Sequence, residues 1–191
     1  MKVGLFFGSF NPIHIGHLVI AEAILHEAEL SQVWFIVSPQ NPFKSPKSLA
    51  YEQDRLHMVR LAIEDNLDMR ALDIEFHMPR PSYTIDTLTY LHEKYPSYDF
   101  RVVMGEDNLN HLHKWKNYEQ LLEENGFIVY PRPHAEDSPL KEYPNVQFVE
   151  APLLDISATY IRKAIKKERS IRYLLPDLVA NYISGKGLYT D

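Results

Sequence analysis

The chain has 191 residues, 45% of them hydrophobic and 24% charged, and its 20 basic and 26 acidic residues leave a formal net charge of −6. This length predicts one domain with a complete core, and the acidic balance argues against a general nucleic-acid-binding protein, which is usually basic. The absence of cysteine excludes disulfides, thiolate metal sites and cysteine nucleophiles. Since no window approaches the ~18 apolar residues of a membrane span and the first apolar run is too short for a signal peptide, we expect a cytoplasmic protein.

The first predicted elements are a strand, a turn and a helix. The apolar run at residues 3–7 shows no alternation, which is typical of a strand buried on both faces of a parallel sheet. Residues 8–17 then form the turn before an amphipathic helix, at the carboxyl end of the strand, where ligands bind in open α/β sheets. Gly8 permits close approach of a ligand, and the helix amides with the imidazoles of His14 and His17 suit a phosphate chain. The same His pair also fits half a metal site, or two surface imidazoles.

Strands and helices alternate along the rest of the chain. Strands are predicted at residues 33–37, 72–78, 100–104, 126–130 and 146–149, the second of them half exposed because its residues alternate. Helices are predicted after Ser48, from Ser82 or Thr84, and over residues 115–122, 157–167 and 177–184. The alternation predicts the α/β class, with a Rossmann-like open, mostly parallel sheet and helices on both faces. We expect a single domain over residues 1–191, with a C-terminal helical part at about 157–191.

Each predicted inner strand ends in a polar or glycine-containing turn. These turns are Gly8-Ser9, Ser38-Pro39, Gly105-Glu106-Asp107 and Pro131-Arg132. Because the carboxyl ends of parallel strands meet at one edge of a sheet, a single pocket there can collect residues from distant parts of the chain.

Four elements of this sequence resemble one enzyme family, in order and over nearly the whole chain. The string Gly-Ser-Phe-Asn-Pro-Ile-His-Ile-Gly-His at residues 8–17 resembles the (T/H)xGH nucleotidyltransferases. Nicotinate mononucleotide adenylyltransferases carry elements similar to residues 82–88, to Gly105-Glu106-Asp107 with Trp115, and to residues 155–162. The resemblance implies adenylyl transfer from ATP to nicotinate mononucleotide, giving deamido-NAD (nicotinate adenine dinucleotide) and pyrophosphate in NAD biosynthesis.

The resemblance also implies roles for particular residues. The implied catalytic residues are His14, His17 and Arg162. The implied ATP-binding residues are Gly8, Ser9, Phe10, His17, Gly105, Asp107, Ile156, Ser157 and Arg162. The implied nicotinate mononucleotide-binding residues are Lys44, Tyr83, Thr84, Trp115, Lys116 and Arg132. Phe43 stands where the family often has His, so no role passes to that position.

Taken singly, several of these residues have plainer interpretations. Ser82 and Asp107 fit helix caps, Trp115 fits a core residue, and most of the basic residues after Arg162 fit a solvated helix face. It is their combination and order that favour a nucleotide site.

The cofactor and partners follow from the same resemblance. Magnesium is expected, bound mainly by ATP oxygens and water, and no residue is predicted as a protein metal ligand. The expected partners are ATP and nicotinate mononucleotide, without nucleic acid or membrane, and the oligomeric state is left open, a homo-oligomer included. Two alternatives are a phosphopantetheine adenylyltransferase, disfavoured by Trp115 and residues 82–87, and a non-catalytic nucleotide-binding regulatory module, disfavoured by His14 and His17.

Overall fold

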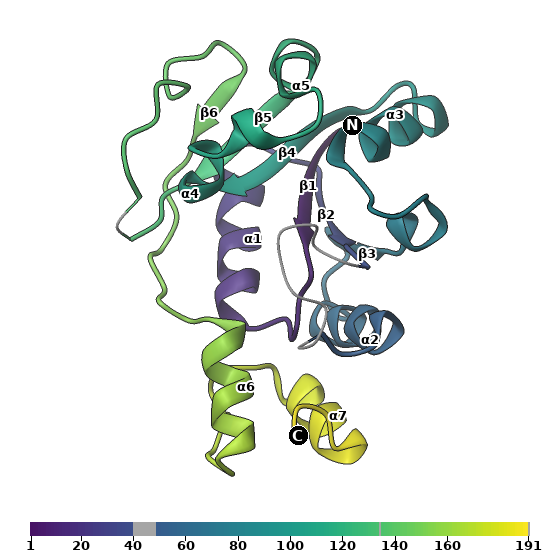
Figure 1. Ribbon diagram of the computed structural model, residues 1–191, viewed down its shortest axis with the longest axis vertical. Coiled ribbons are helices and arrows are strands. Elements are labelled where there is room, and N and C mark those ends of the chain that lie inside the picture. Colours follow the sequence, from purple (N-terminus) through teal and green to yellow (C-terminus); the bar gives the residue numbers. More distant parts are fainter. Residues whose placement is uncertain (40–48, 134, 191) are drawn as a thin grey trace.

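The computed structural model describes residues 1–39, 49–133 and 135–190. Its centre is a six-stranded sheet in the order β3-β2-β1-β4-β5-β6, in which all neighbouring strands are parallel (Figure 1). The strands are β1 (Lys2–Gly8), β2 (Gln32–Val37), β3 (Met69–Leu72), β4 (Asp99–Gly105), β5 (Gly126–Tyr130) and β6 (Val146–Phe148). The parallel sheet predicted from the apolar runs is therefore confirmed.

Helices cover both faces of this sheet. They are α1 (Ile15–Glu27), α2 (Glu52–Ala62), α3 (Thr84–Lys94), α4 (Glu106–Leu109), α5 (Tyr118–Glu124), α6 (Ala158–Lys166) and α7 (Asp177–Lys186), with 3₁₀ turns η2 (Ile74–His77) and η3 (Leu112–Lys114). Alternate residues of β1 enter two separate cores, because successive side chains of a strand point to opposite faces. Leu5 packs with the core under α3 and α5, whereas Phe6 packs with the core under α1, α2, α6 and α7.

The strand order reverses between β1 and β4. The chain runs outward from β1 to β3 and then returns to place β4 beside β1. Ligands of doubly wound sheets bind at such a switch point, outside the carboxyl ends of the strands. The turn at residues 8–17 begins at this point, so the topology places it where a nucleotide site is expected.

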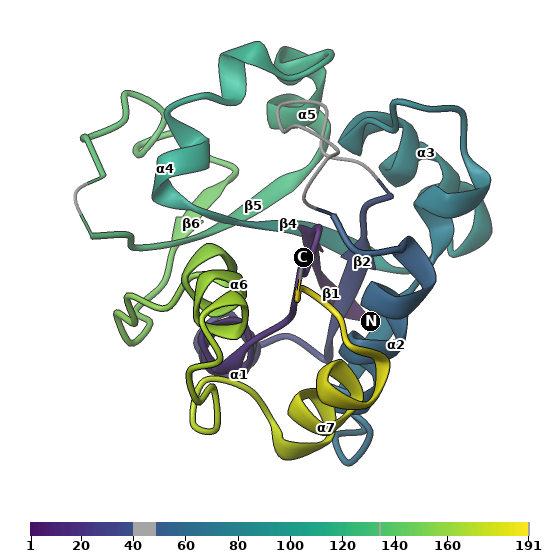
Figure 2. The same ribbon diagram turned by 60° about the horizontal axis from the view of Figure 1, so that its bottom comes forward.

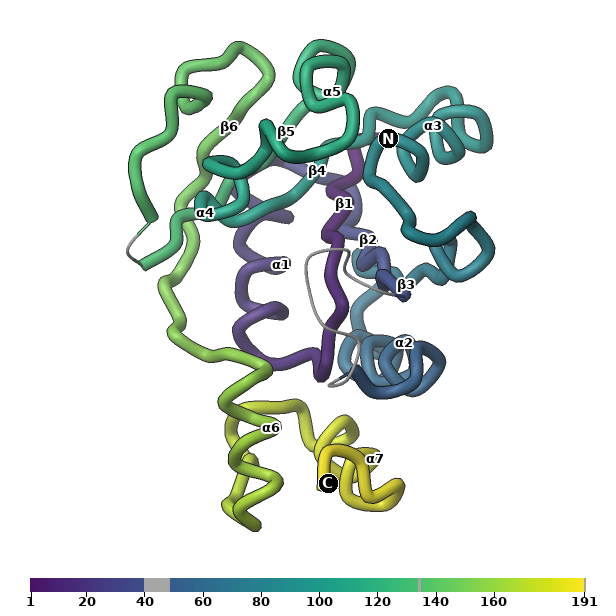
Figure 3. The backbone as a smooth tube through the Cα atoms, in the orientation of Figure 1, coloured from purple at the N-terminus to yellow at the C-terminus, as the bar shows by residue number. Residues whose placement is uncertain are grey.

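The C-terminal helices lie at the same edge. In Figure 1, β1 descends from the N-terminus and α6 and α7 lie below it, and Figure 2 brings this side forward. An extended connection, residues 149–157, leads from β6 to α6 along the outside of α1 (Figure 3). The amide of Ile15 donates to the carbonyl of Leu174 at 3.0 Å, which joins the start of α1 to the segment before α7.

Two predicted elements are wrong in part. The strand expected at residues 72–78 ends at Leu72, and the chain turns into η2, because Glu75 is buried rather than exposed and its carboxylate bonds to later residues. The helix expected from Trp115 starts only at Tyr118, because Asn117 adopts a left-handed φ of 52° that no helix continues through. Ser48 lies outside the described residues, and α2 begins after Tyr51.

Other predicted boundaries hold. Ser157 caps α6, where its hydroxyl accepts the amide of Tyr160 at 3.2 Å. In the described part of the chain, no helix is long and apolar enough to cross a membrane.

Candidate active site

The turn after β1 is shaped by an aromatic residue in a strained backbone conformation. Phe10 has a φ of 43°, which is unusual for a large side chain, and only 2% of its surface is exposed. Its ring folds back over Gly8, where a Cβ atom would lie 2.8 Å from it, and contacts the rings of Phe35 and His17. Phe10 therefore fixes the turn through the contacts of its side chain.

His14 and His17 stand together at the start of α1. Their rings stack at 3.7 Å between centroids and an angle of 27°. The backbone amide of His14 donates to Nδ1 of His17 at 3.2 Å, so a neutral His17 carries its proton on Nε2, which is then the donor atom of the ring. A Cβ atom on Gly16 would come within 3.0 Å of Nδ1 of His14, which explains the glycine between the two histidines.

The environment of His14 keeps its imidazole neutral. Burial, with a smaller effect of the nearby positive charge of Arg132, lowers the pKa of His14 to about 4. Its Nδ1 atom is buried without a hydrogen-bond partner among the described residues. A neutral ring with an unpaired nitrogen at a helix N-terminus is suited to meet an incoming polar group.

The lowered pKa of His14 makes the stability of the protein depend on pH. In the unfolded chain His14 has the ordinary pKa of 6.5, whereas in the folded chain its pKa is about 4. The stabilisation that comes from keeping His14 neutral is therefore complete above pH 6.5 and is lost as the pH falls toward 4. We expect the free energy of unfolding to drop by up to about 3 kcal/mol over that interval through His14 alone. Urea denaturation of the wild type and His14→Asn between pH 7.5 and 4.5 measures the difference, and parallel pH profiles of the two proteins would contradict it.

Residues from the distant end of the chain complete this turn. Nη1 of Arg162, on α6, donates to the carbonyl of Asn11 at 2.7 Å, and its Nη2 lies 3.4 Å from the hydroxyl of Thr159. Cβ of Ile156 lies 3.6 Å from the position that a Cβ of Gly16 would take. The structure thus brings the predicted ATP-binding residues of both chain ends to one place.

A second group lies at the carboxyl ends of β4 and β5. A Cβ atom on Gly105 would lie 2.5 Å from Oδ1 of Asp107 and 3.0 Å from Nε of Arg132. Nε of Arg132 lies 3.6 Å from that carboxylate oxygen, and both side chains are at least one-third exposed, so the pair adds little stability. The guanidinium of Arg132 also lies 5.3 Å from the centroid of the Tyr130 ring, and it is close enough to lower the pKa of His14. Its planar fork suits it to bind a phosphate there.

Three of the predicted mononucleotide residues lie at or beside the start of α3, namely Tyr83, Thr84 and Lys116. Arg132 is not among them, because it lies after β5 beside Asp107. Nζ of Lys116 pairs with both carboxylate oxygens of Asp86 at 2.9 Å and lies 4.9 Å above the ring of Tyr83. Trp115 is half buried against the core under α3 and α5, as its plainer interpretation predicts. Among the described residues, the rings of Tyr83 and Trp115 make no stacking contact with each other. Lys44 lies outside the described residues.

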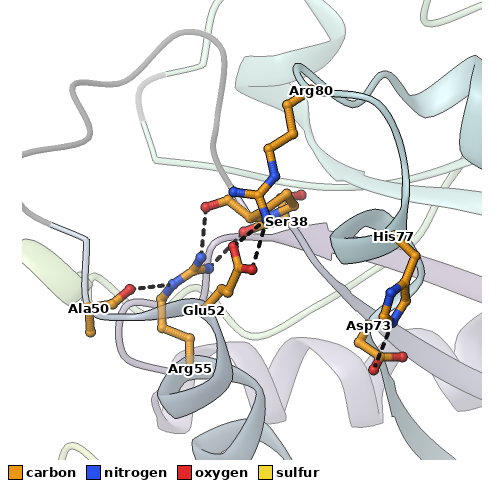
Figure 4. Close-up of polar contacts among 8 residues, drawn as sticks. Ser38, Ala50, Glu52, Arg55, Asp73, His77 and Arg80 are labelled. Atoms are coloured by element: carbon orange, nitrogen blue, oxygen red, sulfur yellow. Dashed lines mark hydrogen bonds and ion pairs between the residues drawn. The ribbon is translucent and has the colours of Figure 1, made fainter.

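Arg55 is the main residue that the sequence did not single out. It is fully buried on α2, and its guanidinium donates four hydrogen bonds to main-chain carbonyls. Figure 4 shows its bonds to Ser38 and Ala50. The acceptors are Ser9 at 2.5 Å, Ser38 at 2.7 Å, Pro39 at 2.8 Å and Ala50 at 3.0 Å. The sequence did contain one indication that Arg55 is buried. It lies on the apolar face of α2, one residue before Leu56 and four before Val59. Arg55 thus joins the turns after β1 and β2 to the segment that leads into α2.

Asn11 makes a second connection of this kind. Its side-chain oxygen accepts the amide of Ala50 at 3.0 Å and the hydroxyl of Tyr189 at 2.8 Å. The turn after β1 is therefore held by α2 on one side and by the residues after α7 on the other.

Known proteins are similar to this chain in sequence and in fold. The family model described as cytidylyltransferase-like matches residues 5–164. A protein of Cytophaga hutchinsonii named "Probable nicotinate-nucleotide adenylyltransferase" is 53% identical over 191 residues, covering 100% of both chains. Among solved structures, Plasmodium falciparum nicotinic acid mononucleotide adenylyltransferase complexed with NaAD matches with a TM-score of 0.82 and 26% identity, over 98% of this chain and 97% of that one. The same enzyme complexed with APC matches with a TM-score of 0.80 and 25% identity, over 98% and 96%.

Proposed function

This chain belongs to the cytidylyltransferase-like family and to the nicotinate-nucleotide adenylyltransferases, and from that premise we propose how its site works. The reaction transfers the adenylyl group of ATP to nicotinate mononucleotide, giving nicotinate adenine dinucleotide and pyrophosphate in NAD biosynthesis. The observation that carries this function is the 53% identity to the Cytophaga hutchinsonii relative over the full length of both chains. It is joined by the His14–His17 pair at the switch point of the sheet.

The chemical step needs little from the protein beyond position and charge. The phosphate oxygen of nicotinate mononucleotide attacks the α-phosphorus of ATP, a new P–O bond forms, and the bond to the β-phosphate oxygen breaks, so that pyrophosphate leaves with the electron pair. Because the nucleophile is already an anion, no side chain has to form a covalent intermediate. We assign His14 and His17 to the phosphates in the transition state, Ser157 and Arg162 to the β- and γ-phosphates, and Asp107 to the ribose hydroxyls.

Magnesium is proposed to enter with ATP. Among the described residues no three or more His, Asp or Glu side chains are grouped so that they could hold a metal ion, and the turn offers amides, imidazoles and a guanidinium instead. These donors fit phosphate oxygens rather than a bare cation, so ATP oxygens and water would supply most magnesium ligands. The bound ion would neutralise charge on the departing pyrophosphate.

The cellular setting is part of the same proposal. A cysteine-free chain whose substrates are ATP and a mononucleotide suits the cytoplasm. The oligomeric state stays open, a homo-oligomer included, and sedimentation measurements would determine it.

The choice between acid and amide substrates gives the test of this function. Nicotinate presents a carboxylate, which only accepts hydrogen bonds, and the site offers it the amides at the start of α3 with Lys116 nearby. Because charge-assisted bonds contribute about 1.5–3 kcal/mol each, nicotinate mononucleotide should exceed nicotinamide mononucleotide at least about tenfold in kcat/KM. The measurement is pyrophosphate release at fixed ATP and magnesium.

The same assay separates the alternatives. Phosphopantetheine as the preferred acceptor would make the chain a different adenylyltransferase, and no turnover with any acceptor would favour a regulatory nucleotide-binding module. Equal kcat/KM for the acid and the amide would contradict the role given to the start of α3.

A further inference from the structure

A buried carboxylate lies behind the start of α3. Glu75, on η2, is 3% exposed. Its Oε2 accepts the hydroxyl of Ser82 at 2.9 Å, and its Oε1 accepts the hydroxyl of Thr87 at 3.0 Å. A further side-chain hydrogen bond comes from Ser38, at the end of β2. Three hydroxyl groups from two distant segments therefore converge on one carboxylate.

These bonds fix the direction in which the segment of residues 82–87 faces. The side chains of Ser82 and Thr87 are buried and point inward to Glu75, so their hydroxyls are committed to it. Tyr83, between them, is 36% exposed, and Thr84 is half buried. The inward pair thus turns the first residues of α3 toward the outside, where Lys116 lies over the Tyr83 ring.

The first turn of α3 has no cap of its own. Its N-cap residue, Tyr83, makes no side-chain cap bond in the described structure. An ordinary Ser or Asp cap would hold the turn by occupying its amides. Here the amide of Asp86 donates to the carbonyl of Tyr83 at 3.0 Å. Glu75 holds the turn from behind, through side chains, and so leaves the amides of Thr84 and Ile85 for a carboxylate ligand.

We infer that Glu75 is a positioning residue that holds the first turn of α3 in the geometry that binds the mononucleotide substrate. This inference rests on the proposed function, since it assigns the start of α3 to the nicotinate carboxylate. Glu75 does not itself touch the substrate. Its effect should therefore concern one substrate, nicotinate mononucleotide, and spare the ATP side built from the turn after β1 and from α6.

Because Glu75 accepts several hydrogen bonds, a small change to its side chain should disturb the whole network. Burial raises the pKa of Glu75, and the hydroxyls of Ser38, Ser82 and Thr87 oppose that effect by donating to the charged form. Glu75→Gln keeps the size of the side chain and replaces one acceptor by an NH₂ group that faces a hydroxyl donor. Thr87→Val keeps the shape and removes one of the bonds to Glu75, with the longer contacts of the same hydroxyl to Sδ of Met78 and to the carbonyl of Tyr83. It serves where Glu75→Gln fails to fold.

The test compares the two substrates in the intact enzyme. For Glu75→Gln we expect kcat/KM and the calorimetric Kd for nicotinate mononucleotide to worsen at least about tenfold, while the Kd for ATP stays within about twofold. Thr87→Val should show a smaller change of the same kind. The matched control is Asp73→Asn, two residues earlier and 41% exposed in an ion pair with His77, which should leave both substrates unchanged.

Two results overturn the inference. One is unchanged binding of nicotinate mononucleotide in folded Glu75→Gln and Thr87→Val, and the other is an equal loss for both substrates that follows the melting temperature, as a structural role alone would give. Failure of the proposed function is a separate result, because it appears in the wild type as absence of turnover with nicotinate mononucleotide.

Discussion

Replacement of His17 by alanine is expected to lower kcat by about 10²–10³, the range found when one preorganised donor to a transition state is removed. The reason lies in the hydrogen bond that fixes its ring. Since Nδ1 accepts the amide of His14, Nε2 is the donor atom of the neutral ring, and the stacked His14 limits its motion. This donor acts on charge that develops during phosphoryl transfer, so kcat should fall far more than substrate affinity. Steady-state kinetics at saturating ATP and nicotinate mononucleotide provide the measurement.

The control for His17 lies on the same helix. His26 is exposed in the last turn of α1 and pairs with Glu22 at 3.1 Å, so His26→Ala tests loss of an imidazole without loss of the site. It should leave kcat unchanged. A His17→Ala enzyme with normal kcat would remove this residue from the mechanism, and a large fall in melting temperature would assign it to the packing around Phe6 and Phe10.

Replacement of Arg55 by methionine should cost about 3–5 kcal/mol of unfolding free energy, the scale for removing one partner from a buried polar group. Four main-chain carbonyls lose their donor at once, and methionine supplies none. Arg55→Lys should recover only part of the loss, because an ammonium lacks the planar fork that reaches separate carbonyls. Urea denaturation at pH 7.5 measures both variants.

Arg60 supplies the comparison for Arg55. It lies on the same helix but is exposed, so Arg60→Met should change the unfolding free energy by less than about 0.5 kcal/mol. A loss below about 1 kcal/mol for Arg55→Met would show that the carbonyls find other donors. That result would contradict the interpretation that Arg55 joins the turns after β1 and β2.

The parts of the fold that the sequence predicted correctly depend on local patterns. Residues 3–7 form a buried strand because an unbroken apolar run suits a strand covered on both faces. Ser157 caps a helix because its hydroxyl reaches the amide three residues on, within one turn. The position of residues 8–17 follows from the strand and helix around them. Such features are decided by neighbours in the chain, so periodicity and residue type are enough to find them.

Two of the errors and omissions, at Glu75 and Arg55, depend on distant partners, and a third depends on a local backbone conformation. The alternating run around Glu75 predicted an exposed carboxylate, but its partners stand 7 and 12 residues later and draw it into the interior. Arg55 was not singled out because it binds main-chain carbonyl oxygens, whose positions the residue types of a sequence do not indicate. The helix at Trp115 was placed too early because the left-handed turn at Asn117 depends on the local backbone rather than on periodicity. The substrate roles of the individual site residues, Lys44 included, stay predictions.

The contacts of Asn11 have a consequence for the synthesis of this protein. Its carbonyl binds Arg162 and its side chain binds Tyr189, at sequence separations of 151 and 178 residues. Because translation proceeds from the N-terminus to the C-terminus, a ribosome makes Arg162 and Tyr189 after Asn11, by 151 and 178 residues. A nascent chain that has completed β1 to β5 already holds most of the sheet, but its phosphate turn lacks the contacts made by α6 and by Tyr189. The turn of residues 8–17 should therefore reach its final geometry only after residue 189 has been synthesised.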